Sequence, residues 1–177
     1  MLPTELNPPL TTPRLRLEPQ VAGHAEAMMK VLNDLRIPSD PPTDLGALRR
    51  RFATLEWRRS SDGSLWHLTW TVFLRETAIG TVQASVEHAQ NSAHVGCLFA
   101  PAVWGHGYAA EAMRAVLAFL PSLGVSLARA DIDTSNLAAQ RLVSRLNFVQ
   151  VSEVQDTDEF GGVFSDEFIY ELQLPVS

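Results

Sequence analysis

A short glycine-containing segment, residues 104–110, has residue types suited to binding a diphosphate through its main chain. It reads Trp-Gly-His-Gly-Tyr-Ala-Ala and lies between a β-rich segment and one whose apolar residues recur at helical spacing. A helix N-terminus presents N–H groups without intrahelical partners and the positive end of the helix dipole. Gly105 and Gly107 have no side chain, so an anion can approach the backbone closely. The segment predicts a pyrophosphate site; the alternative is a tight strand-to-helix turn that binds nothing.

Three kinds of nucleotide-binding loop place glycines before a helix. A Walker A loop requires Gly-Lys-Ser/Thr after its spacer, which this segment does not have. A dinucleotide-binding fingerprint would match Gly105, Gly107 and Ala110, and Asp131 stands about 20 residues further on. Those glycines, however, directly follow the first strand of an open parallel sheet, whereas here Pro101 and several predicted elements come before them. A nicotinamide-dependent oxidoreductase is therefore the weaker hypothesis, and a coenzyme A loop the stronger one.

The elements that must position this loop follow from the hydrophobic periodicity. Apolar residues recur at helical spacing over residues 21–35, 45–57, 109–120 and 136–146. Strand patterns cover residues 15–18, 67–74, 78–86, 93–99, 125–132, 148–154 and 163–174, with Gly161 and Gly162 between the last two. Asn147 stands where a left-handed helix terminator belongs. The order β-α-α-β-β-β-α-β-α-β-β predicts a mixed α/β sheet with helices on both faces.

Composition indicates one soluble domain over residues 1–177, because 46% of the residues are hydrophobic and 19% are charged. No apolar stretch approaches the roughly 20 residues of a membrane span, and the first ten residues do not resemble a signal peptide. The net charge of −6 argues against nucleic acid as a partner. Cys97 is the only cysteine, so no internal disulfide forms and a cytoplasmic location is expected. No group of acids and histidines has metal-ligand spacing, so no metal is expected.

The loop and its surroundings resemble the GNAT N-acetyltransferases, specifically their RimJ/RimL-like branch of ribosomal-protein acetyltransferases. Trp-Gly-His-Gly-Tyr-Ala-Ala-Glu-Ala at residues 104–112 is similar to the acetyl-CoA loop of that family. Thr-Pro-Arg-Leu-Arg-Leu at 12–17, Ile-Gly-Thr-Val at 79–82 and Val-Gly-Cys at 95–97 resemble three strands that precede it. Asn-Leu-Ala-Ala at 136–139 and the segment 142–148 resemble the family's Asn-x-x-Ser helix and its closing Lys-Leu-Gly-Phe.

The chain departs from the family pattern at several positions. Cys97 replaces a usual Tyr, and Ala139 replaces a frequent Ser. Val143 stands where many relatives carry a Tyr that can protonate the leaving thiolate, which puts a Tyr general acid at that position in doubt. A non-catalytic acyl-CoA-binding or regulatory module on the same fold is therefore the second hypothesis.

The resemblance implies a GNAT fold whose mostly antiparallel sheet is splayed between strands 93–99 and 128–133, where the pantetheine arm inserts. It implies acetyl-CoA as cosubstrate and transfer of its acetyl group to a primary amine, either a protein N-terminal α-amine or a small-molecule amine. It assigns coenzyme contacts to the strand before the loop, the loop itself and the predicted helix at 136–146: Leu98, Phe99, Trp104, Gly105, His106, Gly107, Tyr108, Ala109, Ala110, Asn136, Arg141 and Arg145. For the two arginines the alternative is a solvated helix face.

Direct attack on a thioester requires a neutral amine, and an alkyl amine with a pKa of about 10 is mostly protonated at pH 7. A general base must take that proton. The candidates are His94, where relatives often carry Glu, and Glu87 and His88 at a strand end; Asn136 is expected near the transfer site. The alternative for each candidate base is an ordinary exposed strand or turn residue. The acceptor site is expected to be formed by the two N-terminal helices, the loop between them and the hairpin at 161–162. No membrane partner is expected, and a homodimer is left open.

Overall fold

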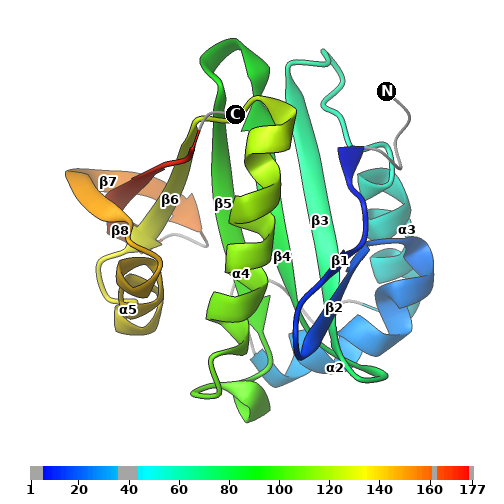
Figure 1. Cartoon of the computed structure of the whole chain (residues 1–177). Helices are drawn as coiled ribbons and strands as arrows, with labels where there is room; N and C mark the ends of the chain where they lie inside the picture. Colours follow the sequence, from blue (N-terminus) through cyan, green and yellow to red (C-terminus); the bar gives the residue numbers. More distant parts are fainter. Residues whose placement is uncertain (1–5, 36–43, 161–162, 176–177) are drawn as a thin grey trace.

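The described part of this computed structural model, residues 6–35, 44–160 and 163–175, forms an eight-stranded sheet (Figure 1). The strands in chain order are β1 (Leu10–Thr11), β2 (Leu15–Pro19), β3 (Leu65–Leu74), β4 (Thr77–Glu87), β5 (Ser92–Phe99), β6 (Leu127–Asp133), β7 (Val149–Phe160) and β8 (Val163–Gln173). Their spatial order is β1-β2-β3-β4-β5-β6-β8-β7. Neighbours are antiparallel except β5 and β6, which run parallel. The predicted mixed, mostly antiparallel sheet is confirmed.

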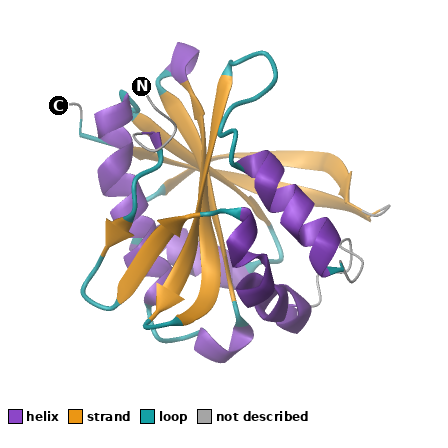
Figure 2. Cartoon of the chain, turned by 90° about the vertical axis from the view of Figure 1, so that its right-hand side faces the viewer, coloured by secondary structure: helices purple, strands orange, loops and turns teal. Residues whose placement is uncertain are grey.

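Helices cover both faces of the sheet, as the periodicity predicted (Figure 2). One face carries α2 (Ala25–Leu35) and α3 (Leu45–Leu55), preceded by the 3-10 turn η1 (Ala22–His24). The other carries α4 (Tyr108–Phe119) and α5 (Leu137–Arg145). The shorter turns are η2 (His88–Gln90), η3 (Pro101–Val103) and η4 (Leu120–Leu123). We refer to the two sides as the α2 face and the α4 face.

Alternation along the central strands produces a separate apolar core on each face, because successive side chains of a strand point to opposite sides. On β3, Leu68, Trp70 and Val72 are fully buried on the α4 face. Trp70 makes an edge-to-face contact with Phe119 of α4, with ring centroids 6.0 Å apart. Phe73 instead belongs to the core beneath α2 and α3. The two cores fix the sheet between its two helical layers.

Side-chain caps set where two of the helices begin. Asp44 Oδ1 accepts a hydrogen bond from Ala47 N at 2.8 Å at the start of α3. Asn136 Oδ1 accepts one from Ala139 N at 3.0 Å at the start of α5. Each cap satisfies an N–H group that has no partner inside its helix. Asn147 has a φ of 66° just after α5, which confirms the predicted left-handed terminator.

The sheet opens between β5 and β6, as the family resemblance implied. The two strands pair only at their first residues, Ser92 with Leu127, Ala93 with Ala128 and His94 with Arg129. Beyond this point β5 keeps pairing with β4, and β6 with β8, to their ends. Each strand therefore follows its outer neighbour, and β6 turns away from β5 (Figure 1). The result is a wedge bordered by residues 95–99 of β5 and 130–133 of β6.

Some boundaries differ from the sequence prediction. The segment before residue 13 contains β1, which was not predicted. β1 pairs across a tight turn with Arg16 and Leu17 of β2. β7 extends past residue 154 to Phe160 because it pairs with β8. Gly161 and Gly162 lie outside the described residues. Among the helices of the described ranges, none has both the length and the apolar character needed to cross a membrane.

Candidate functional site

The predicted loop joins the wedge to the start of α4. Trp104 anchors it, because its indole Nε1 donates a hydrogen bond to the carbonyl oxygen of Phe99 at 2.7 Å. Gly105 and Gly107 have φ values of 80° and 79°, in the left-handed region that favours glycine. Gly107 is the N-cap residue of α4 and supplies no side-chain cap. The chain therefore enters the helix through two left-handed backbone conformations, which residues with side chains adopt only with strain.

The N-terminus of α4 is open. The hydrogen bond from Glu111 N to Gly107 O, 3.0 Å long, closes the first turn of α4, so the N–H groups of residues 108–110 come before the intrahelical ladder. A Cβ added at Gly105 would meet nothing within 4 Å. Unpaired N–H groups at a helix N-terminus with open space before them suit an anion. We call residues 104–110 the α4 corner.

An ion pair ties the α4 corner to the turn between β1 and β2. Arg14 Nε lies 2.6 Å from Glu111 Oε2, and Thr12 Oγ1 donates to Glu111 Oε1 at 2.6 Å. Arg14 also donates to the carbonyl of His106 at 3.1 Å and lies over the Tyr108 ring, 4.5 Å from its centroid. Burial alone would raise the pKa of Glu111, but the hydrogen bonds from Thr12 and Arg14 outweigh it and lower that pKa. The corner is thus fixed by a residue 97 positions earlier in the chain.

Positive charge surrounds a hollow of about 660 Å³ beside the α4 corner. Its walls include Arg14, Arg114 and Arg145, and its single carboxylate among the described residues, Glu111, is paired with Arg14. An adjoining hollow of about 450 Å³ is lined by Leu137, Gln140, Arg141, Ser144, Arg145 and Tyr170. Arg141 and Arg145 therefore both line hollows on the α4 face, and Arg114 joins them although the sequence prediction did not include it. Such clustering favours phosphate groups.

A third cavity, of about 330 Å³, lies on the α2 face, and we call it the α2–α3 cavity. It is lined by Gln20, Met28, Leu32, Arg51, Phe52, Leu55, His67, Leu68, Thr69, Thr81, Gln83, Ala84, Ser85, Cys97 and Leu98. Because Cys97 and Leu98 belong to the open part of β5, the cavity reaches the border of the wedge. Burial raises the pKa of the Cys97 thiol to about 12, so the thiol stays protonated at neutral pH.

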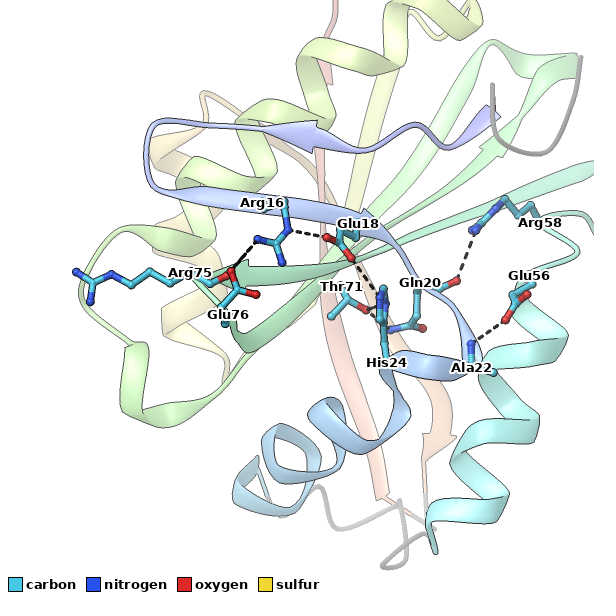
Figure 3. Close-up of polar contacts among 10 residues, drawn as sticks. All are labelled: Arg16, Glu18, Gln20, Ala22, His24, Glu56, Arg58, Thr71, Arg75 and Glu76. Atoms are coloured by element: carbon cyan, nitrogen blue, oxygen red, sulfur yellow. Dashed lines mark hydrogen bonds and ion pairs between the residues drawn. The ribbon is translucent and has the colours of Figure 1, made fainter.

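A polar network behind the cavity holds Gln20 in its wall (Figure 3). Gln20 Nε2 donates to Thr71 Oγ1 at 3.4 Å, and Thr71 Oγ1 lies 3.1 Å from His24 Nδ1. His24 Nε2 lies 3.3 Å from Glu18 Oε2. Burial lowers the pKa of His24 by more than the neighbouring Glu18 raises it. Arg58 completes the network by donating to the Gln20 carbonyl at 3.5 Å.

None of the predicted catalytic residues is among the described residues that line the α2–α3 cavity. His94 is half exposed, and its Nδ1 lies 3.3 Å from Asp131 Oδ2. Glu87 accepts a hydrogen bond from Gln90 Nε2 at 3.0 Å. His88 packs edge-to-face on Trp66. The carboxamide oxygen of Asn136 caps α5, as described above.

His67 is a cavity residue that the sequence prediction did not identify. Its Nδ1 lies 3.1 Å from Ser85 Oγ, and both side chains line the α2–α3 cavity. In the sequence His67 stands inside a β-rich run with no motif around it. Only the pairing of β3 with β4, which places His67 opposite Ser85, brings the two together.

The comparisons with known proteins agree with this geometry. An acetyltransferase (GNAT) domain model matches residues 14–149. RimL, a ribosomal L7/L12 α-N-protein acetyltransferase in complex with coenzyme A, superposes with a TM-score of 0.85 at 14% identity, over 96% of this chain and 99% of RimL. The microcin C7 self-immunity acetyltransferase MccE, in complex with acetyl-CoA and AMP, gives 0.82 at 16% identity, over 92% and 94%.

A third solved structure is an acetyltransferase from Salmonella typhimurium that modifies the N-terminal serine of 50S ribosomal subunit protein L7/L12. It has a TM-score of 0.82 at 13% identity, over 93% of this chain and 97% of that one. At these identities the likeness is one of fold. No protein in the curated set matches. The mostly antiparallel sheet also differs from the open parallel sheet of dinucleotide-binding proteins, so the oxidoreductase hypothesis is not retained.

Proposed function

The chain belongs to the GNAT acetyltransferase family, and we propose that it transfers the acetyl group of acetyl-CoA to the α-amine of a protein N-terminus held in the α2–α3 cavity. The observation that carries this proposal is the wedge between β5 and β6, which leads directly into the open N-terminus of α4. On its α2 side the same stretch of β5 borders the cavity. One strand thus separates a site suited to an acyl-CoA from a site suited to an acceptor.

In this arrangement the α4 corner holds the pyrophosphate, because the main-chain N–H groups of residues 108–110 precede the intrahelical hydrogen bonds and a side chain added at Gly105 would meet nothing within 4 Å. Arg14, Arg114 and Arg145 add positive charge beside it. Residues 95–99 of β5 have no backbone partner on β6, so their free edge suits the amides of the pantetheine arm. The carbonyl of Phe99 already accepts a hydrogen bond from the Trp104 indole. The strand register turns the main-chain groups of Leu98 toward Thr81 of β4, so the N–H of Phe99 is the better placed of the two predicted strand contacts.

The chemistry is attack of a neutral amine on the thioester carbon, with the new C–N bond replacing the C–S bond. An α-amine with a pKa of about 8 is partly neutral at pH 7, so a weak base suffices to complete its deprotonation. His94, Glu87 and His88 remain candidates for that base, with Asn136 near the coenzyme arm. Val143 is buried and carries no proton donor for the departing thiolate. The amine's own second proton balances the charge on the sulfur.

The two neighbours that act on the N-terminus of L7/L12 support a protein α-amine as the acceptor class. The lining of the α2–α3 cavity supports it as well, since hydroxyl, amide and apolar groups surround His67 and Arg51 there. A chain end can enter such a cavity while the rest of the substrate stays outside. A small-molecule amine is the competing acceptor class, and an amine panel distinguishes the two.

A matched pair of glycine substitutions tests the coenzyme site. Gly107→Glu places a negative side chain at the α4 corner, whereas Gly124→Glu places the same side chain after the far end of that helix. The two glycines have φ values of 79° and 81°, so the backbone strain is similar. We expect Gly107→Glu to weaken CoA binding in calorimetry by more than about tenfold and Gly124→Glu to leave it within about twofold.

Turnover is measured separately as free thiol released from acetyl-CoA over a panel of peptide N-termini and small amines. Release with peptides supports the proposed reaction. CoA binding without any release across the panel would favour the non-catalytic acyl-CoA-binding module. Equal CoA affinity of the two glutamate variants would refute the assignment of the α4 corner.

A further inference from the structure

We propose that His67, oriented by Ser85, is the group that accepts the proton of the amine in the α2–α3 cavity. This inference rests on the proposed function and adds a catalytic residue to it. His67 and Ser85 line the cavity together with Cys97 and Leu98 of the open part of β5. His67 therefore lines the same cavity as the strand segment along which the thioester would lie.

Strand register places His67 in a row of polar residues across the sheet. His67 on β3 pairs with Ser85 on β4, and Ser85 pairs with His94 on β5. Residues paired in this way lie side by side on the same face. Of the two histidines, His67 is the one that lines the described part of the cavity, while His94 lies beside Asp131. The row thus has one histidine in the cavity and one at the wedge.

The hydrogen bond with Ser85 determines what the imidazole of His67 can do. Nδ1 lies 3.1 Å from Ser85 Oγ, and within the described residues Nε2 has no hydrogen-bond partner. When Ser85 accepts from Nδ1–H, Nε2 carries the lone pair and can accept a proton. The main-chain N–H of His67 donates to the carbonyl of Arg58 at 2.9 Å, which fixes the strand at this position. The main chain of His67 is therefore fixed by the bond to Arg58, and its ring by the contact of Nδ1 with Ser85.

The proton balance is complete without another reactant. The ammonium form of the substrate gives one proton to His67 Nε2, and the neutral nitrogen then attacks the thioester carbon. The C–N bond forms, the C–S bond breaks, and the second proton on nitrogen goes to the sulfur. His67 later releases its proton to solvent. Besides His67, the charged and titratable residues among the described lining of the cavity are Arg51 of α3 and Cys97 of β5. Outside that lining, Glu87 and His94 lie on β4 and β5, and Arg58 precedes β3.

The test compares His67→Gln with His24→Gln, a matched histidine that contacts Thr71 and Glu18 outside the cavity lining. Thiol release is measured from pH 6 to pH 9.5 with a peptide α-amine, and CoA binding is measured by calorimetry. We expect His67→Gln to lower kcat/KM at pH 7 by about 100-fold or more while CoA affinity stays within about twofold. Its rate should then rise with pH up to the pKa of the free amine, about 8. His24→Gln should keep the wild-type rate and pH profile.

Ser85→Ala is the second variant, because it keeps His67 and removes only its orienting partner. We expect about a tenfold lower kcat with a KM for acetyl-CoA close to wild type. A wild-type pH profile in both His67→Gln and Ser85→Ala would overturn the assignment. Loss of CoA binding in His67→Gln would overturn it too, because the residue would then be structural. No thiol release from the wild-type protein would overturn the proposed function and this inference together.

Discussion

Substituting Gly80 by alanine should destabilise the protein where β4 pairs with β5, the strand that borders the wedge. Gly80 is buried on β4 opposite Phe99 of β5. A Cβ added there would clash with the carbonyl oxygen of Leu98 and lie 2.7 Å from Cδ1 of the Phe99 ring. The carbonyl is backbone and cannot rotate away, so β5 itself must shift. Leu98 lies in the part of β5 proposed to hold the thioester.

The expected magnitude follows from that contact. Overpacking in a core costs about 1–3 kcal/mol, and a clash with fixed backbone belongs at the upper end. For a domain of this size each kcal/mol lowers Tm by about 2–4 °C, so Gly80→Ala should lower Tm by roughly 6–12 °C. Because the shift moves β5, the affinity for CoA should fall as well.

The assay is thermal unfolding together with CoA calorimetry, with Gly96→Ala as the matched control. Gly96 lies on the neighbouring strand, and a Cβ there would meet only the Gln83 side chain, at 3.4 Å from Nε2. That side chain is flexible, so Gly96→Ala should change Tm by no more than about 2 °C. Similar Tm losses in the two variants would contradict this reasoning, because the close approach of β4 to β5 at Gly80 would then not explain the loss of stability in Gly80→Ala.

Two further predictions concern ionisable groups. Glu111→Gln keeps the shape of the side chain but removes the charge paired with the half-exposed Arg14, so Tm should fall by only a few degrees. In steady-state kinetics the KM for acetyl-CoA should rise more than kcat falls. His24 has a lowered pKa in the folded protein, so the unfolded chain binds its proton first as the pH falls. The stability contributed by neutral His24 is therefore present above about pH 6.5 and declines on acidification, and urea unfolding of His24→Gln should show a shallower decline between pH 7 and pH 5.

The sequence was most informative where structure is local. The helix that follows Gly107 and the left-handed conformation of Asn147 depend on neighbouring residues, and both are found where they were predicted. The wedge between β5 and β6 followed from the family resemblance and not from periodicity, because a short apolar strand has no signal for where its pairing stops.

The contacts that complete the site could not be predicted, because they depend on strand register and long-range packing. Arg14 reaches Glu111 across 97 positions, and His67 meets Ser85 only through the pairing of β3 with β4. No spacing rule in a single sequence joins such residues. His94 was chosen by its match to a family position, and the structure places it beside Asp131 at the wedge.

The most direct measurement is an amide NMR titration of the protein with CoA. If main-chain N–H groups at the start of α4 bind the pyrophosphate, the largest shift changes should fall on residues 105–110, followed by residues 95–99 of β5. The amide of Gly124, at the far end of the same helical segment, should hardly move. Saturable CoA binding that leaves residues 105–110 unshifted would contradict the proposed site.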